Sequence, residues 1–122
     1  MLRSRDPRVS FEDILENIAR IERHTTDMDQ ASFAQDDKTI DAVERCLARI
    51  SEAAVRLGET AQEVCPGVAW RDIRGLGNHL RHEYRRVDLS RIWAMVEEYL
   101  PALKSACADA LERLRGSNQD LD

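Results

Sequence analysis

One stretch decides the fold class of this 122-residue chain: residues 36–57, DDKTIDAVERCLARISEAAVRL. Its apolar side chains recur at steps of three and four positions, namely Ile40, Val43, Leu47, Ile50, Ala54 and Leu57. That spacing places one continuous apolar stripe along an α-helix. Asp36 or Asp37 can cap the first turn, and Gly58 suits a left-handed helix end. The stretch therefore predicts a long amphipathic helix with well-marked ends.

The region before this stretch also has helical periodicity. Its apolar side chains keep to one stripe, formed by Phe11, Ile14, Leu15, Ile18, Ile21 and Met28. Ser10 can accept a hydrogen bond from the first turn, and Asp13 follows three positions later, as in an N-terminal capping motif. We therefore expect a first helix that begins at Ser10 and ends at about residue 30.

The region after residue 57 predicts further helical segments separated by clear breaks. Residues 59–64 can resume as another helical turn before Cys65, Pro66 and Gly67 interrupt the chain. A third main helix, with a narrow apolar face, is expected over residues 70–84. Asp88 is a good N-cap for a long last helix, in which Pro101 should produce a kink.

These segments predict an all-α fold, an antiparallel bundle of four to five helices. Aromatic residues are only 5% of the chain while hydrophobic residues are 43%, which favours a core of Leu, Ile, Val and Ala. The length suits one domain, which we place at residues 1–116. The polar residues 117–122 should form a frayed tail.

Cysteine usage and the lack of long apolar runs indicate a cytoplasmic protein. The three cysteines have no paired spacing, and no apolar leader follows Met1. Cys46 and Cys107 fall on or near apolar stripes, which is typical of core thiols. The apolar runs are far shorter than the roughly 20 residues of a membrane-spanning helix, so no membrane partner is expected.

Charge is distributed unevenly along the chain. A net charge of -5 argues against a protein that coats long nucleic acid, because such proteins carry a basic excess. Residues 70–91 nevertheless hold six arginines against three acidic residues, a local charge of +3. The local excess leaves room for a site that binds anions.

Five of the residues in this region share one helical face: Arg74, Asn78, Arg81, His82 and Arg85. Guanidinium groups bind phosphate oxygens in pairs, and a histidine exchanges protons near neutral pH. The face therefore suggests phosphate chemistry. The alternative is a solvated arginine-rich face that pairs with the acidic remainder of the protein.

Two glycines inside the same predicted helix call for an explanation. Gly75 and Gly77 each cost about 1 kcal/mol relative to alanine in a helix interior. One interpretation is close packing against a neighbouring helix. The other is room for a bulky ligand beside the helix.

Residues 70–84, WRDIRGLGNHLRHEY, followed by Val87 and Asp88, resemble the signature helix of the HEPN superfamily in its HepT-like branch. The resemblance covers most of the chain and includes EEYLPAL at residues 97–103. It implies a HEPN-like two-fold homodimer that acts as a metal-independent RNA endonuclease. It also implies a toxin encoded beside a minimal nucleotidyltransferase antitoxin, which adenylylates a tyrosine of the toxin.

The family motif is Arg, four residues, His, any residue, Tyr, with a polar residue commonly following the Arg. By this resemblance His82 is the acid or base, Asn78 orients the substrate, and Tyr84 is the tyrosine that is modified. The Arg position falls on Gly77, and Arg74 or Arg81 can bring a guanidinium to the same face.

The neighbouring residues complete the expected site. Arg85 and Arg86 are further candidates for binding RNA phosphate. His79 and His82 are three positions apart and Glu83 adjoins them, as in some metal sites, but sequence places no third ligand and the surrounding arginines repel cations. We expect no metal and no cofactor.

The expected reaction starts with attack of the RNA 2′-hydroxyl on the adjacent phosphate, which needs a base, an acid and cations. A two-fold dimer would supply one His82 from each chain. Two functions remain open from sequence. The chain is either a HepT-like ribonuclease toxin, or an inactive HEPN dimer that is a binding partner or substrate of a nucleotidyltransferase.

Overall fold

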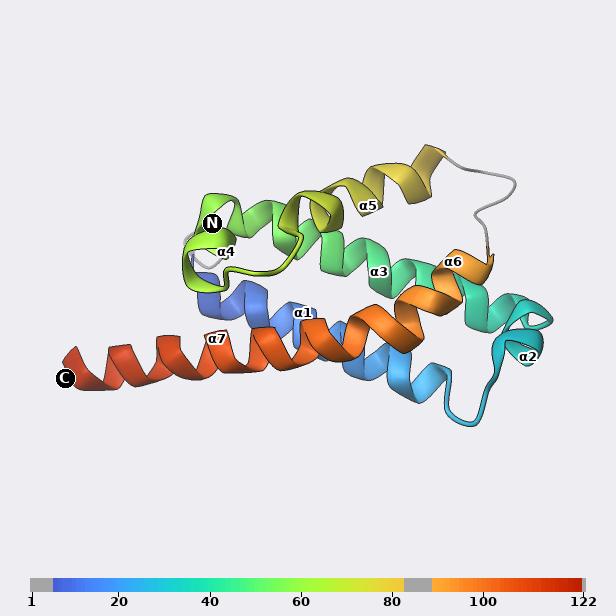
Figure 1. The fold of residues 1–122 in the computed structure, drawn as a ribbon, viewed down its shortest axis with the longest axis horizontal. Coiled ribbons are helices and arrows are strands. Elements are labelled where there is room, and N and C mark those ends of the chain that lie inside the picture. Colours follow the sequence, from blue (N-terminus) through green and yellow to red (C-terminus); the bar gives the residue numbers. More distant parts are fainter. Residues whose placement is uncertain (1–5, 83–88, 122) are drawn as a thin grey trace.

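The fold is an antiparallel helical bundle, seen in a computed structural model that describes residues 6–82 and 89–121, apart from the side chains at positions 78, 79, 81, 82 and 118–121. Four arms run alternately in opposite directions along the long axis (Figure 1). They are α1 (Pro7–His24), α3 (Asp37–Leu57), α5 (Trp70–His82), and a last arm of α6 (Leu89–Ala94), η2 (Met95–Tyr99) and α7 (Leu100–Leu121). Two short helices, α2 (Gln30–Ala34) and α4 (Glu59–Val64), lie in the connections. The predicted all-α bundle is confirmed.

The first helix begins earlier and ends earlier than the sequence pattern predicted. Asp6 is its N-cap, and the Asp6 carboxylate accepts a hydrogen bond from the Arg8 N–H at 2.9 Å. Pro7 follows at the first helical position, where its fixed φ favours the helix and no N–H is needed. Ser10 is therefore a buried residue inside α1. The helix ends at His24, and Asp27 has a positive φ of 63° that no α-helix continues through.

The decisive helix forms as its sequence predicts. The Asp36 carboxylate accepts a hydrogen bond from the Thr39 N–H at 3.1 Å and so caps α3. Gly58 ends the helix with a φ of 54°. The whole apolar stripe of α3 is buried except for Ile40, which is partly buried. The predicted further turn after Gly58 is also present, as α4.

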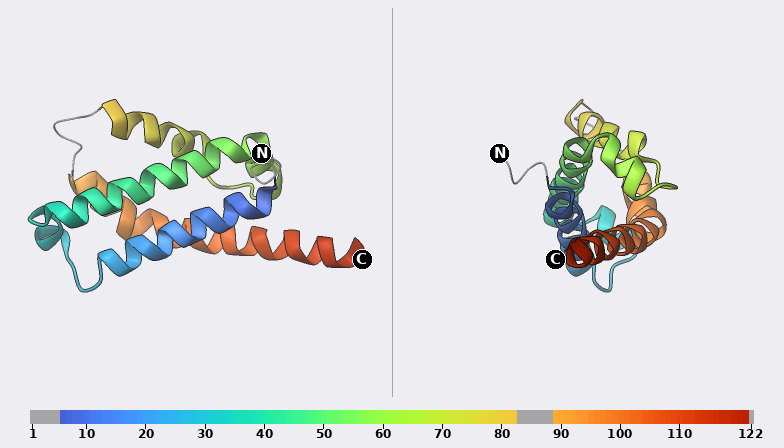
Figure 2. Two further views of the ribbon diagram at one scale, coloured as in Figure 1. Left: turned by 180° about the vertical axis from the view of Figure 1, so that it is seen from behind. Right: turned by 90° about the vertical axis from the view of Figure 1, so that its left-hand side faces the viewer.

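The core lies between the four arms, which surround a common interior in the end-on view of Figure 2. Two aromatic contacts connect elements that are distant in sequence. The rings of Trp70 and Phe11 meet edge to face with centroids 6.1 Å apart, and those of Phe33 and Trp93 lie 5.2 Å apart. Apolar burial of this kind is the main stabilising term of the fold.

The last arm contains a π-helical turn rather than a simple kink at Pro101. The turn spans Met95–Tyr99, and the Leu100 N–H donates to the Met95 carbonyl. Pro101 has no N–H, so the regular hydrogen-bond ladder cannot pass through it, and the irregular turn lies directly before it. α7 then continues to Leu121. The division into a domain at residues 1–116 and a frayed tail at 117–122 stays a prediction.

The three cysteines are free and buried, which confirms the core assignment of Cys46 and Cys107. Burial raises the pKa of the Cys107 thiol to about 12, with a smaller contribution from Cys65. Such a thiol stays protonated and unreactive at neutral pH. In the part of the chain that the structure describes, no helix is both long and apolar enough to cross a membrane.

Candidate active site on helix α5

The start of α5 is fixed by Trp70. Its side chain is buried, and its indole N–H donates to the Cys65 carbonyl at 2.8 Å. This bond spans the break at Pro66 and Gly67, so it ties the connection to the helix that follows. The contact with Phe11 joins the same side chain to α1. The N-terminal half of α5 is therefore anchored to the core.

The middle of α5 is held by a hydroxyl group of α3. Ser51 is buried, with 2% of its surface exposed. Its Oγ donates to the Arg74 carbonyl at 3.0 Å and accepts from the Gly77 N–H at 2.9 Å. One hydroxyl thus uses both its donor and an acceptor position on a single turn of α5.

The two glycines of α5 have different surroundings. Gly77 is buried and lies against α3 through its bond to Ser51, as the packing interpretation predicted. Gly75 is exposed, and a Cβ added there would meet nothing within 4 Å. Close packing therefore does not explain why position 75 is a glycine, because the space beside it is open.

The structure places the backbone of several predicted site residues on one helix. Arg74, Asn78, Arg81 and His82 all lie in α5, at positions that share a helical face. Arg74 is half-buried, and the other three side chains are outside those described. Tyr84, Arg85 and Arg86 lie outside the described residues altogether. Their predicted roles stay predictions.

The described arginines of this region do not pair with the acidic remainder of the protein. Ion pairs among the described side chains use other cations: Arg8, Arg20, Arg56, Lys104 and Arg115. Within the same described set, Arg71, Arg74 and Arg91 form no ion pair. The ion pairs of the described side chains therefore lie on other elements and on other basic residues.

An apolar groove of about 450 Å³ runs beside α5. Leu76 and Leu80 line one wall and Leu47 of α3 contributes to it, while the other wall comes from α6 and η2. Arg91 and Glu98 are the charged residues among its lining. The groove thus presents apolar side chains of α5 and of the last arm on the same surface as the Arg91 guanidinium.

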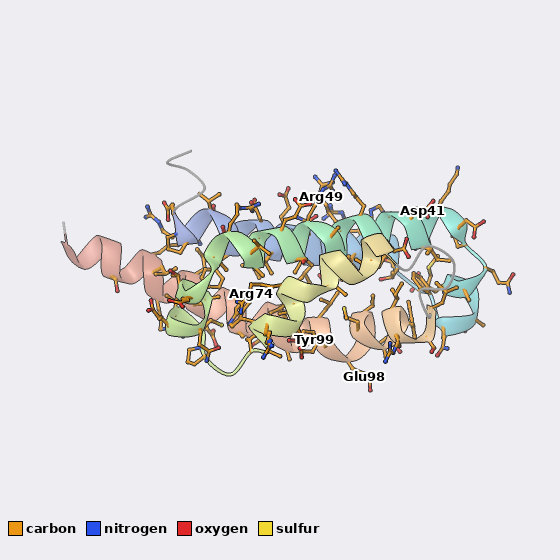
Figure 3. The ribbon with its side chains drawn as sticks, turned by 90° about the horizontal axis from the view of Figure 1, so that it is seen from above. Asp41, Arg49, Arg74, Glu98 and Tyr99 are labelled. Carbon is orange, nitrogen blue, oxygen red and sulfur yellow. The ribbon has the colours of Figure 1, made fainter. Side chains whose placement is uncertain are left out.

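Tyr99 connects the last arm to the start of α5. Burial raises the pKa of the Tyr99 hydroxyl, a backbone hydrogen bond from Ala69 opposes this rise, and Asp72 adds to it. Figure 3 shows Arg74 and Tyr99 on one side of the bundle, whereas Arg49 and Asp41 project from its far edge along α3. Tyr99 of η2 thus lies beside the residue that precedes α5, and it also lines the apolar groove.

Sequence reasoning missed Ser51, Arg91 and Tyr99 as residues that shape this site. Ser51 had a usable signal, because it is a polar residue one turn after Leu47, on the edge of the apolar stripe. Arg91 was only one of the six arginines that gave residues 70–91 their local charge, and Tyr99 gave no signal, because the wall they form depends on how the last arm packs. No group of three or more potential metal ligands occurs among the side chains that the structure describes.

Comparison with known proteins places residues 14–110 in the family described as ribonuclease HepT-like. A protein of Thermococcus cleftensis named "Probable ribonuclease HepT" is 36% identical over 94 residues, 77% of this chain and 86% of the relative. A candidate RNase of Methanocaldococcus jannaschii is 33% identical over 100 residues, 82% of this chain and 92% of the relative. No solved structure gives a significant match.

Proposed function

Because the chain belongs to the HepT-like ribonuclease family, we propose that it is a metal-independent RNA endonuclease whose acid or base is His82. The observation that carries the proposal is the placement of positions 74, 78, 81 and 82 on one helix, α5. That helix is anchored at Trp70 and again at Ser51. A catalytic histidine on such a support can be held in a fixed position.

The proposed reaction proceeds by attack of the RNA 2′-hydroxyl on the neighbouring phosphorus. A base takes the 2′-hydroxyl proton, the bond from phosphorus to the 5′-oxygen of the next nucleotide breaks, and an acid protonates that leaving oxygen. His82 performs one of these proton transfers. Guanidinium groups stabilise the negative charge that develops on the phosphate oxygens.

Arg81 is the better substitute for the guanidinium that Gly77 lacks. A helix rises about 1.5 Å per residue, so position 74 lies about 12 Å from position 82 along the axis while position 81 is adjacent to it. Arg74 then serves a more distant phosphate, and Asn78 orients the substrate between them.

The active unit in this proposal is a homodimer. The apolar groove beside α5 is lined by the partly buried side chains of Leu76, Leu80 and Met95, which a second chain could cover. A two-fold dimer contains two α5 helices, so each chain would contribute one His82. A Leu80→Glu variant should then be monomeric in light scattering, whereas Val55→Glu, at an apolar side chain that is 58% exposed on α3, should not change the oligomeric state.

The proposed partner is a minimal nucleotidyltransferase antitoxin in the cytoplasm. Its proposed target is the Tyr84 hydroxyl, two residues beyond the end of α5. An attached adenylyl group adds negative charge and bulk where RNA phosphate would bind, and so inhibits cleavage. Arg85 and Arg86 extend the cationic surface for RNA on the same segment.

The second candidate function is an inactive HEPN dimer that is a substrate or binding partner of the nucleotidyltransferase. Gly77 favours it, because that position is buried, faces α3 and carries no guanidinium. An RNA-cleavage assay in EDTA separates the two functions. Wild type should cleave, His82→Ala and Arg81→Ala should lose most of the activity, and His24→Ala, on α1, should retain it. Wild-type protein that cleaves no faster than His82→Ala would support the inactive dimer.

A further inference from the structure

We propose that Ser51 is a positioning residue for the candidate active site, which holds the turn of α5 that precedes Asn78, Arg81 and His82. The inference rests on the proposed function of α5 as the catalytic helix. Its structural basis is the pair of hydrogen bonds from one buried hydroxyl, 2.9 Å to the Gly77 N–H and 3.0 Å to the Arg74 carbonyl. These bonds span 26 and 23 residues of sequence.

The hydrogen bonding of Ser51 differs from the ordinary behaviour of a helical hydroxyl. Such a hydroxyl usually returns to a carbonyl three or four residues earlier in its own helix. At the end of α1, the C-cap Thr25 does so with the Ile21 carbonyl at 2.8 Å, and Thr26, just beyond the helix, with the Glu22 carbonyl at 3.0 Å. Ser51 instead directs both bonds to another helix. The hydroxyl therefore acts between α3 and α5, not within α3.

Two bonds to one turn restrain α5 more than apolar packing does. Contacts through Ile73 and Leu76 are non-directional, so they resist separation of the helices but allow sliding and rotation. A hydroxyl that donates to one backbone group and accepts from another, three residues later, has directional geometry at both. It thus fixes the rotation of α5 about its axis and its position along that axis.

The position of this restraint gives it a functional consequence. Asn78 directly follows Gly77, and position 82 lies about 7.5 Å from Gly77 along the helix axis. Each residue turns the helix by about 100°, so a small rotation at Gly77 is carried to every later side chain. Gly77 has no Cβ to shield its N–H from Ser51. Gly77, which stands at the motif's Arg position, therefore presents its backbone N–H to Ser51 of α3.

The test compares three variants of the full chain. Ser51→Ala removes both bonds, and Ser51→Cys keeps the side-chain size but bonds weakly. Ser10→Ala is the matched control, because Ser10 is 1% exposed on α1 and its hydroxyl has no hydrogen-bond partner among the residues that the structure describes. We expect both Ser51 variants to lower kcat for RNA cleavage by about tenfold or more with KM changed less than about twofold, as for a misplaced catalytic group. Ser10→Ala should leave kcat within about twofold.

Nuclear magnetic resonance supplies a readout independent of catalysis. Ser51→Ala and Ser51→Cys should speed hydrogen exchange of the Gly77 amide and shift the His82 ring resonances, and Ser10→Ala should do neither. Ser51 variants with the kcat, Gly77 exchange and His82 resonances of Ser10→Ala would overturn the inference. If wild type fails to cleave RNA, the proposed catalysis fails, and the positioning role is decided by the Gly77 and His82 signals. If Ser51→Ala does not fold, Ser51→Cys decides.

Discussion

Replacement of Gly75 by alanine should stabilise the protein. Gly75 lies inside α5 with an ordinary helical φ, and a Cβ added there meets nothing within 4 Å. Alanine therefore gains the difference in helix propensity, about 1 kcal/mol, without a steric cost. In a chain of this size that difference raises the melting temperature by roughly 4 °C.

Gly58→Ala is the matched control for this prediction. Gly58 has a φ of +54° and a ψ of -135°, a conformation in which an alanine side chain is strained. This substitution should destabilise the protein by about 1 to 3 kcal/mol. Urea unfolding of both variants with wild type gives the two changes in free energy. A Gly75→Ala protein that is less stable than wild type would refute the conclusion that the Gly75 flank is open.

Three further predictions concern the anchors of the fold. Trp70→Phe removes the donor to the buried Cys65 carbonyl and should lower the free energy of unfolding by about 2 kcal/mol in urea titrations, and no change would contradict that role. Asp36→Ala should cost about 1 kcal/mol in the same assay because α3 loses its N-cap, whereas Asp36→Asn should cost less. Because the folded chain holds the Cys107 pKa at about 12, above the ordinary value of 9.0, the unfolded chain ionises first as pH rises. Stability should therefore fall between about pH 9 and 12, by up to about 1.4 kcal/mol per pH unit, and fall less steeply in Cys107→Ala, in thermal melts across that range.

Elements governed by local sequence were the ones that could be predicted. α3 follows from its apolar spacing with Asp36 and Gly58 at its ends, because periodicity and capping depend on neighbours along the chain. The apolar pattern predicts the start of α1 at Ser10, whereas Asp6 and Pro7 form the stronger local signal and begin the helix. The error came from taking Ser10, and not Asp6, as the N-cap.

Features that depend on which helices meet could not be predicted. Ser51 is one polar residue among many on α3, and only the packing of α5 on α3 shows that both its bonds go to Arg74 and Gly77. Pro101 indicated an irregular helix, but its position could not specify the π-helical turn over Met95–Tyr99. The sequence predicts which positions share the candidate face of α5. The structure adds the two anchors of that helix, the Trp70 indole and the Ser51 hydroxyl.

The most direct test of the account is the identity of the RNA product. Wild-type protein in EDTA should convert an oligonucleotide into a fragment ending in a 2′,3′-cyclic phosphate, because the 2′-hydroxyl is the nucleophile. A single 2′-deoxy substitution at the cleaved position and the His82→Ala variant should each abolish that product in mass spectrometry. Cleavage at the same rate in either case would contradict the assignment of His82 and of the internal nucleophile.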